Sequence, residues 1–332
     1  MNVVVIAGGV GGAKLAFGLA KVVPAQDLTV VVNVGDDFTH LGLRICPDLD
    51  TVTYTLAGLD NRDTGWGLAA DTFQALESLQ KLGGPTWFRL GDRDLATHLM
   101  RMSLLAEGLR LTEATSRICQ ALGVGPKVLP ATDDAVPTRV ITDEGELDFQ
   151  DYFVRRRCEP RVTDIVFAGI EQASASAEVV AALEVADIVV FAPSNPFVSI
   201  QPVLALPIGG QSAHGIEHSG KAATIRDLVA RKAAVAVSPI VGGEAIKGPA
   251  AKMMLELGLD VSPVGVARRY VGTVRAFVMD EVDATRVPEV EALGLRVRTA
   301  QSIMRTDEDR VALARECLEL AGSSGDEEWT GR

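Results

Sequence analysis

The sequence predicts an α/β protein in which a mostly parallel sheet carries helices on both faces, together with one helical insertion. Two observations lead to this class. Short apolar runs of strand length recur along the 332 residues and alternate with segments of helical periodicity. The first of these runs also leads directly into a glycine-rich loop and an amphipathic helix. Alternating strands and helices build parallel sheets that are covered on both faces, so the expected arrangement is Rossmann-like.

The composition limits the classes of function. The chain is 47% hydrophobic, which allows a large core. Its net charge is -12, and the one short basic cluster is at 155–157, which argues against a nucleic-acid surface. The apolar start at 3–7 is too short for a membrane span or a signal peptide, so we expect a cytoplasmic protein. The cysteines show no CxxC spacing and fit reduced thiols.

The first strand, Val3–Ala7, runs into a loop of glycines, then a lysine and a helix. Backbone amides at such a loop and at a helix N-terminus can cradle phosphate. The spacing G-x-G-x-x-K satisfies neither the dinucleotide fingerprint nor the P-loop. A tight turn needs fewer glycines, so we expect phosphate or nucleotide contact, with Lys14 either a phosphate ligand or a solvated helix residue. The candidates are Gly8, Gly9, Gly11, Gly12 and Lys14.

Carboxylates follow the second strand, Leu28–Val32. Asn33, Asp36 and Asp37 come at its carboxyl end, where open α/β sheets bind ligands. The sequence therefore predicts a site for a metal ion and phosphate at this edge of the sheet.

A second acidic pair follows within a few residues. Pro47 suits the first turn of a helix, which places Asp48 and Asp50 in that turn and, we expect, facing the same region. The alternative is that the first pair forms a turn and the second favours the helix dipole. Because both pairs adjoin the glycine loop, we interpret the four carboxylates as one functional cluster.

Residues 59–126 change character and are interpreted as a helical insertion. Helices are expected at 69–82, at 95–105 and from a capping Thr112 to about 122. Asp92 or Asp94 could cap the helix that follows them. Capping explains one aspartate only, so we also expect ligand contact from Asp92 and Arg93. His98 lies within the helical pattern and is interpreted as a structural histidine.

Asp133 and Asp134 form another acidic pair at a strand end, before a hairpin expected at 138–141 and 147–149. The alternation of strands and helices then resumes. The remaining parallel strands are expected at 165–168, 188–192 and 233–237, with helices at 175–185 and 225–231.

The loops after two of these strands supply further polar groups. Ser194, Asn195 and Ser199 follow one strand, and Gly242 and Gly243 follow the next. Such loops can be rigid turns. Because they recur at several strand ends, we interpret them as parts of one ligand cleft.

His214, Glu217 and His218 match the letters of the H-x-x-E-H zinc pattern. That pattern requires a helix, which the surrounding glycines disfavour, so we expect no zinc site. The remaining elements are a helix at 249–257, a strand at 276–279, a helix at 308–320 and a disordered tail at 323–332. The expected division is an α/β core at 1–58 and 127–322, with 59–126 as one wall of the cleft.

Seven motifs, in this order, resemble a known family. They are GGVGGAK, NVGDD, CPDLDT, LGDRDLATH, PATDD, FAPSNPFVSI and SPIVGG with KGPA. The chain is similar to the 2-phospho-L-lactate transferase family (CofD/FbiA) of coenzyme F-420 biosynthesis over nearly its whole length. The segment at 208–221 departs from the shorter helical stretch expected there.

The resemblance implies a magnesium-dependent transferase and a homodimer. Members transfer a phospho-lactyl or phospho-enolpyruvyl unit from a guanosine diphosphate ester to the ribityl 5′-hydroxyl of 7,8-didemethyl-8-hydroxy-5-deazariboflavin, releasing GMP. The deazaflavin contacts fall on Asp50 and Arg89. Asp36 and Asp37, with Asp48, are the expected Mg²⁺ ligands. Asp50 is expected to orient or deprotonate the attacking hydroxyl, and orientation suits a carboxylate near a metal better.

Two alternatives stay open. An NAD-dependent oxidoreductase would explain the first strand, loop and helix, with Asp36 or Asp37 as the ribose ligand, but it leaves PATDD and LGDRD unused. A YvcK-like nucleotide-sugar-binding regulatory protein would keep the fold without turnover. Tight NAD binding would support the first alternative, and binding without product the second.

Overall fold

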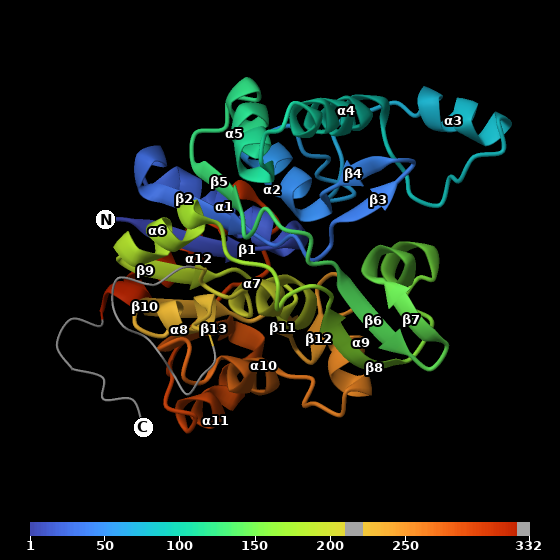
Figure 1. Ribbon diagram of the computed structural model, residues 1–332. Helices are drawn as coiled ribbons and strands as arrows, with labels where there is room; N and C mark the ends of the chain where they lie inside the picture. Colours follow the sequence, from blue (N-terminus) through green and yellow to red (C-terminus); the bar gives the residue numbers. More distant parts are fainter. Residues whose placement is uncertain (210–221, 324–332) are drawn as a thin grey trace.

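The computed structural model describes residues 1–209 and 222–323, and a seven-stranded parallel sheet lies at its centre (Figure 1). The strand order is β14-β13-β10-β9-β1-β2-β5, and every neighbouring pair is parallel. The bounds are β1 Val3–Ala7, β2 Leu28–Val32, β5 Lys127–Pro130, β9 Ile188–Phe191, β10 Ala233–Val237, β13 Ala276–Asp280 and β14 Arg296–Ala300. This confirms the predicted fold class, although β14 was not predicted.

The strand order reverses direction between β1 and β9, because the chain first moves from β1 outward through β2 to β5 and then returns to β9. Such a switch point leaves a crevice at the carboxyl ends of the two strands, where ligands bind in open α/β sheets. The glycine loop follows β1 and the Ser194 loop follows β9, so both face this crevice.

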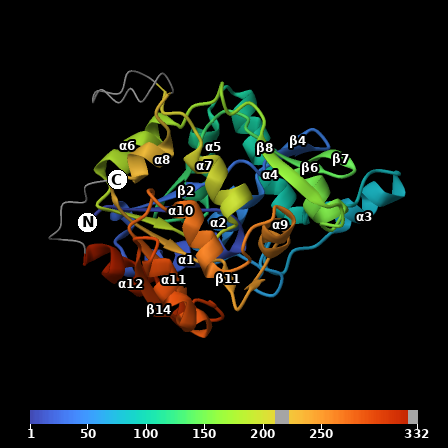
Figure 2. The same ribbon diagram turned by 90° about the horizontal axis from the view of Figure 1, so that it is seen from below.

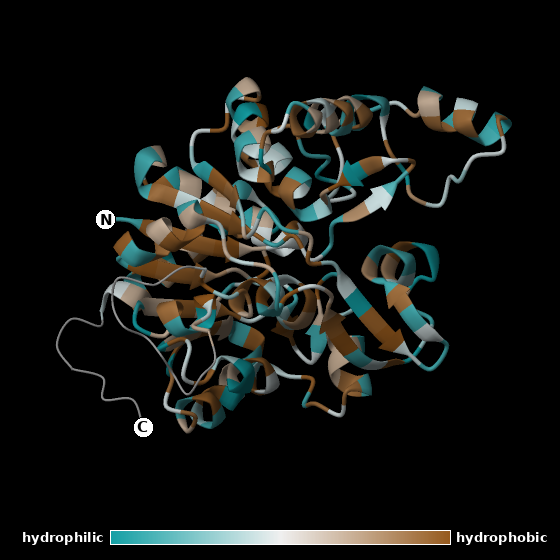
Figure 3. Cartoon of the chain, in the orientation of Figure 1, coloured by the Kyte–Doolittle hydropathy of each residue, from teal (hydrophilic) through white to brown (hydrophobic). Residues whose placement is uncertain are grey.

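Each face of the sheet carries its own hydrophobic core. Alternate residues of β1 point to opposite faces, so Val4 and Ile6 join one core while Val3 and Val5 join the other. Both cores exclude water, which explains why the central strands are continuous apolar runs (Figure 3).

Helices cover the two faces in separate groups, each packed against one of the two cores. One group comprises α1 Gly9–Val22, α2 Pro47–Ala57, α5 Leu111–Ala121 and α12 Asp307–Gly322. The other comprises α6 Ala177–Val185, α7 Gln201–Leu204, α8 Ile225–Val229, α9 Ala250–Glu256, α10 Pro263–Tyr270 and α11 Val287–Glu291. Short helical turns lie at Ala25–Asp27, Asp151–Arg155, η3 Pro196–Ile200 and Glu281–Arg286.

The region at 59–126 is helical as predicted, with α3 Gln74–Lys81 and α4 Asp92–Ala106 before α5. In both views α3 lies at the outer end of this region (Figures 1 and 2). The expected helix at 69–82 begins later, at Gln74. The expectation that Thr112 caps the third helix is wrong, because Arg110 is the N-cap residue and forms a capping box with Glu113.

The prediction that the strand at 165–168 belongs to the parallel sheet is wrong. The segment belongs to β8 Val162–Phe167, which pairs antiparallel with β6 Thr138–Thr142. With β7 Gly145–Asp148 these form a separate three-stranded sheet, whose β8 has one solvent-facing side, as antiparallel sheets tolerate. Two hairpins were not predicted: β3 Phe38–His40 with β4 Leu43–Ile45, and β11 Ile240–Val241 with β12 Glu244–Ala245.

Within the described ranges, 1–209 and 222–323, no helix combines the length and apolarity needed to cross a membrane. The H-x-x-E-H stretch and residues 324–332 of the expected tail lie outside these ranges.

Candidate active site

The glycine loop brings the chain after β1 against the loop after β9. Ser194 Oγ donates to the carbonyl of Gly8 at 2.8 Å and accepts from the Gly8 amide at 3.1 Å. A Cβ at Gly11 would collide with the Pro193 carbonyl, and one at Gly12 would lie 2.7 Å from Ser194 Oγ. These two glycines therefore permit the close approach of the two loops. The structure thus gives them a role in packing.

A carboxylate lies at the N-terminus of α1. The Gly9 amide donates a hydrogen bond to Asp48 Oδ1 at 2.6 Å. An acidic side chain of α2 therefore occupies one of the amides that we expected to bind phosphate. Lys14, farther along α1, donates from Nζ to the Met304 carbonyl at 2.8 Å. Burial and the nearby Arg310 lower the pKa of Lys14. Lys14 is therefore anchored to the chain and is not a freely solvated helix residue.

Asn33 joins two of the predicted carboxylates. Its Nδ2 donates to Asp36 Oδ1 at 3.0 Å and to Asp48 Oδ2 at 2.9 Å, and also lies 3.0 Å from the Val198 carbonyl in η3. The Gly35 amide donates to Asn33 Oδ1, which fixes the orientation of the side-chain amide. Asn33 thus lies between Asp36 and Asp48 and links β2, α2 and η3.

Burial makes these carboxylates costly to ionise. It raises the pKa of Asp36, and repulsion from Asp48 raises it further. Burial also raises the pKa of Asp48 to about 6 and that of Asp37 to about 6, the latter opposed by Arg44, whose guanidinium is 3.2 Å from Asp37 Oδ2. Asp37 Oδ1 is buried without a hydrogen-bond partner. Carboxylates with an unpaired oxygen are ligands that a hard cation prefers, although among the described residues the oxygens of Asp36, Asp37 and Asp48 do not all lie within 4.8 Å of one another.

Asp50 faces the other side of α2. The Arg101 guanidinium of α4 contacts both oxygens of Asp50, and all of these side chains are almost fully buried. Residues two apart on a helix do not face each other, which is why Asp48 and Asp50 separate. The expectation of one cluster of four carboxylates is therefore corrected: Asp50 belongs to a second polar group.

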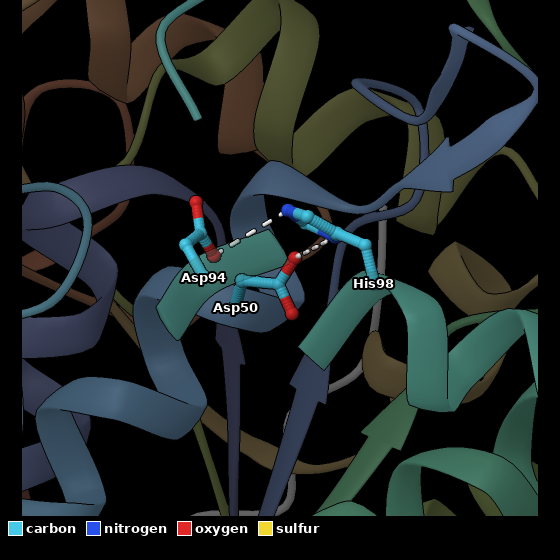
Figure 4. Close-up of side chains that lie close together, drawn as sticks. All are labelled: Asp50, Asp94 and His98. Atoms are coloured by element: carbon cyan, nitrogen blue, oxygen red, sulfur yellow. Dashed lines mark ion pairs between the residues drawn. The ribbon is translucent and has the colours of Figure 1, made fainter. Parts of the chain in front are cut away.

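His98 and Asp94 extend this second group (Figure 4). His98 Nδ1 lies 3.7 Å from Asp50 Oδ2, and its Nε2 lies 3.4 Å from Asp94 Oδ1. Tyr54 donates its hydroxyl to Asp94 Oδ1 at 2.7 Å. The prediction that His98 has a structural role agrees with this position, since the ring lies between Asp50 of α2 and Asp94 of its own helix, α4.

Within the described residues, Asp50, Asp94 and His98 are the one trio of potential metal ligands whose atoms all lie within 4.8 Å of one another. Arg101 already neutralises Asp50 and also lies 3.1 Å from His98 Nδ1. A metal cation here would be repelled by this guanidinium. The arrangement is better suited to holding Asp50 than to binding metal.

The LGDRD motif has a structural explanation that the sequence did not reveal. Asp92 accepts from the amides of Gln74 and Ala75, so it caps α3 and not α4. The Asp71 carboxylate accepts hydrogen bonds from the backbone amides of Arg93 and Asp94 and so caps α4. The two acidic side chains thus fasten the ends of two helices to each other.

We expect Asp92→Ala to lower Tm by a few degrees, because two helix amides lose their acceptor. Turnover per folded molecule should stay near that of the unchanged protein. Thermal unfolding and steady-state kinetics would measure both quantities, with the exposed Glu77→Ala of α3 as the matched control. Loss of turnover without loss of stability would show that Asp92 contacts a substrate.

Other predicted binding residues also have local roles. Asp133 accepts from the Thr112 amide, and Asp134 accepts from the Ser174 amide. Asn195 Oδ1 caps η3 by accepting from Phe197. Gly242 and Gly243 have φ values of 60° and 82° and form the two-residue turn between β11 and β12. Each of these contacts between described residues is a cap, a turn or a link to a neighbouring element.

Ser199 is one loop residue that does reach the site. It lies in η3 beside Gly8, where a Cβ on the glycine would be 2.6 Å from the serine Cβ. The loops after β1, β2 and β9 therefore meet at the switch point through Gly8, Asn33, Ser194 and Ser199.

Sequence reasoning missed Arg44 and Arg101, which neutralise Asp37 and Asp50. No local signal marks Arg101, since it lies 51 residues from its partner in the chain. It also missed a group of rings beside Asp37. Phe38 and His40 of β3 pack against Trp87 and Phe88, with the closest centroids, those of Phe38 and Phe88, 4.8 Å apart.

Comparisons with known proteins agree on one family. The family model described as 2-phospho-L-lactate transferase CofD matches residues 3–316. A phosphoenolpyruvate transferase of Streptomyces griseus is 42% identical over 97% of this chain and 98% of its own. A 2-phospho-L-lactate transferase of Methanosarcina barkeri is 39% identical over 94% of this chain and 96% of its own.

The fold has solved relatives as well. A crystal structure of a UPF0052-family protein from Bacillus halodurans superposes with a TM-score of 0.58 at 16% identity, covering 96% of this chain and 98% of that one. At that identity the likeness concerns the fold alone. The full-length sequence matches confirm the resemblance that the seven motifs indicated: the chain belongs to the CofD family of 2-phospho-L-lactate transferases.

Proposed function

We propose that this transferase moves a phospho-lactyl or phospho-enolpyruvyl unit from lactyl- or enolpyruvyl-diphospho-guanosine to the ribityl 5′-hydroxyl of 7,8-didemethyl-8-hydroxy-5-deazariboflavin, with release of GMP. The observation that carries the proposal is the group of buried carboxylates, Asp36, Asp37 and Asp48, beside the glycine loop at the switch point. Such a group repels a diphosphate unless a cation is present, which suits metal-assisted transfer.

Asp36, Asp37 and Asp48 would hold Mg²⁺ in this proposal. When bound, the ion supplies charge neutralisation for a diphosphate and for its leaving phosphate. The chain itself contributes the fixed frame: Asn33 orients Asp36 and Asp48, and Arg44 orients Asp37 through Oδ2. Asp37 Oδ1 stays available, since it has no partner in the described residues.

Asp50 orients the attacking hydroxyl in this proposal and does not remove its proton. The Arg101 guanidinium contacts both carboxylate oxygens of Asp50 and so fixes the direction of the carboxylate. Correct orientation alone accounts for large rate factors when the reacting atoms are held in place. The proton leaves to solvent or to the diphosphate.

Arg89 is the proposed contact for the deazaflavin ring. Its guanidinium carbon lies 4.5 Å from the centroid of the Phe73 ring, and the side chain is exposed. A planar guanidinium can stack on a ring and still donate hydrogen bonds to ring carbonyls.

Arg89→Ala is expected to raise the KM for the deazaflavin about tenfold with little change in kcat, because ring binding is shared by the ground and transition states. Steady-state kinetics, varying each substrate separately, would measure this. Lys81→Ala on the neighbouring helix serves as the control. A rise confined to the KM of the guanosine substrate would contradict the assignment.

Direct assay of the reaction tests the proposed function. Purified protein, Mg²⁺, the deazaflavin and each guanosine diphosphate ester should yield GMP and the phosphodiester product, detected by mass spectrometry. The donor giving the higher kcat/KM identifies the three-carbon acid. Tight binding of a nucleotide sugar without any product would instead favour the YvcK-like alternative, and binding of NAD the oxidoreductase. The expected homodimer is proposed on the resemblance alone, and light scattering would test it.

A further inference from the structure

Two arginines on the face of the sheet covered by α8 and α10 have no carboxylate partner among residues 1–209 and 222–323. Arg226 lies in α8 and Arg269 in α10, and both are half-buried. Neither makes an ion pair with any residue in the described part of the chain, although the sequence has 44 acidic and 32 basic residues. Arginine is seldom buried without an anion to balance it, so this pair requires an explanation.

Neutral groups hold the first guanidinium in place. Arg226 donates to Thr273 Oγ1 at 2.6 Å and to Gln201 Oε1 at 2.7 Å. These acceptors fix the direction of the side chain but do not neutralise its charge. Burial consequently lowers the pKa of Arg226.

An aromatic ring holds the second guanidinium. The guanidinium carbon of Arg269 lies 4.2 Å from the centroid of the Phe197 ring, and Nε is buried without a hydrogen-bond partner. Burial lowers the pKa of Arg269, and the positive charge of Arg226 lowers it further. The two charges are therefore near enough to repel each other.

The Tyr270 hydroxyl lies within the field of both arginines. The Tyr270 side chain is 2% exposed. Burial raises the pKa of Tyr270, while the charges of Arg269 and Arg226 act in the opposite direction. The buried Nε of Arg269 has no acceptor among the described residues, and it lies beside a second guanidinium that no described carboxylate balances.

We propose that Arg226, Arg269 and Tyr270 form a binding site for a doubly charged oxyanion of the phosphate or phosphate-monoester class. Guanidinium groups match phosphate oxygens through paired hydrogen bonds, and the phenol supplies a further donor. A dianion balances both positive charges, whereas a single carboxylate balances one. This choice of ligand class follows from the charge of the pair.

The site is separate from the carboxylate group at the switch point, although one short segment adjoins both. Phe197, under Arg269, belongs to η3, and the Val198 carbonyl of the same segment accepts from Asn33. The anion site itself uses no residue of the proposed transferase centre. A binding measurement can therefore test it without reference to turnover.

The experiment is a titration of the full-length protein with inorganic phosphate at constant ionic strength. Calorimetry measures the binding, and thermal unfolding measures the change in Tm. We expect saturable binding and a rise in Tm, because a ligand that binds only the folded state stabilises it. Arg269→Gln and Arg269→Lys should each weaken this binding about tenfold or more, since a paired charge-assisted contact is lost. Tyr270→Phe should weaken it less, as one donor is removed.

Arg268→Gln is the matched control, because Arg268 is the adjacent residue of α10, is exposed and has only a 4.0 Å contact with Asp260. It should bind phosphate like the unchanged protein. A phosphate site in the switch-point crevice would persist in every variant, so the decisive quantity is the difference between the unchanged protein and Arg269→Gln.

Equal phosphate binding in the unchanged protein, Arg269→Lys and Tyr270→Phe would overturn the proposal. Acetate binding as tight as phosphate binding would overturn the choice of a dianion. Tyr270→Phe and Arg269→Lys keep the test decisive if Arg269→Gln does not fold.

Discussion

Asp36→Asn is expected to reduce turnover about a thousandfold or more while the protein stays folded. The reason is that a metal ion contributes several kcal/mol of charge stabilisation to a phosphoryl-type transition state, and the neutral amide is a far weaker ligand. Asparagine retains an oxygen that can still accept from Asn33 Nδ2, so the local hydrogen bond survives. Asp37→Asn should behave similarly, since it removes the negative charge of the carboxylate whose Oδ1 has no hydrogen-bond partner among the described residues.

The stability of the same variant should move in the opposite direction. Burial and the neighbouring Asp48 raise the pKa of Asp36, which means that its ionised form destabilises the metal-free protein at neutral pH. Removing that charge is therefore expected to leave Tm unchanged or to raise it without Mg²⁺. Functional sites commonly carry such a conflict between stability and activity.

Kinetics over a range of Mg²⁺ concentrations and thermal unfolding without metal would test both statements. The exposed Asp63→Asn is the matched control, since it removes the same charge away from the buried group. Full activity of Asp36→Asn and Asp37→Asn at saturating Mg²⁺ would remove the metal assignment.

The second large effect is expected at the buried pair of Asp50 and Arg101. Arg101→Met should destabilise the fold by about 3–5 kcal/mol, because Asp50 would remain buried without its counter-ion. Asp50→Ala should lower kcat by about a hundredfold, because a misplaced hydroxyl loses the advantage of orientation. Both side chains are nearly inaccessible to water, at 6% for Asp50 and 2% for Arg101, so solvent cannot replace the lost partner.

The double variant Asp50→Asn with Arg101→Met separates the two roles. It removes both charges together, so most of the lost stability should return, while turnover should not. Thermal unfolding and kcat for the single and double variants form the measurement. Recovery of wild-type kcat in the double variant would show that Asp50 is a structural residue only, and would place the acceptor hydroxyl elsewhere.

The sequence predicted the elements whose cause is local. The apolar run Val3–Ala7 and the run Leu28–Val32, which is interrupted only by Thr29, are typical of strands in a sheet covered on both faces, and both strands are found at the predicted bounds. Pro47 at the start of α2 was predicted for the same kind of reason, since its fixed φ suits a first helical turn. The strand at 165–168 failed because a short apolar run does not reveal its pairing partner.

The assignment of the aspartates shows the limit of such reasoning. Asp92 or Asp94 was expected to cap the helix that follows them, yet Asp92 caps α3, and Asp71 caps α4. In one arrangement each aspartate caps the helix that follows it, and in the other the two aspartates exchange helices. The order of residues along the chain cannot distinguish them, because the N-terminal amides of α3 and α4 find an acceptor in both. Gly242 and Gly243 likewise serve a hairpin turn whose partner strands were too short to recognise.

The sequence by itself determined the parallel α/β class, the strand ends that carry Asn33, Asp36 and Asp37, and the family, because each depends on a pattern contained within a few neighbouring residues. The tertiary structure alone decided which charges meet. It placed Asp48 on the amide of Gly9 and Asp50 on Arg101. Those partners come from distant segments, and the energy of a buried charge depends on the groups that fold around it, which no local pattern records.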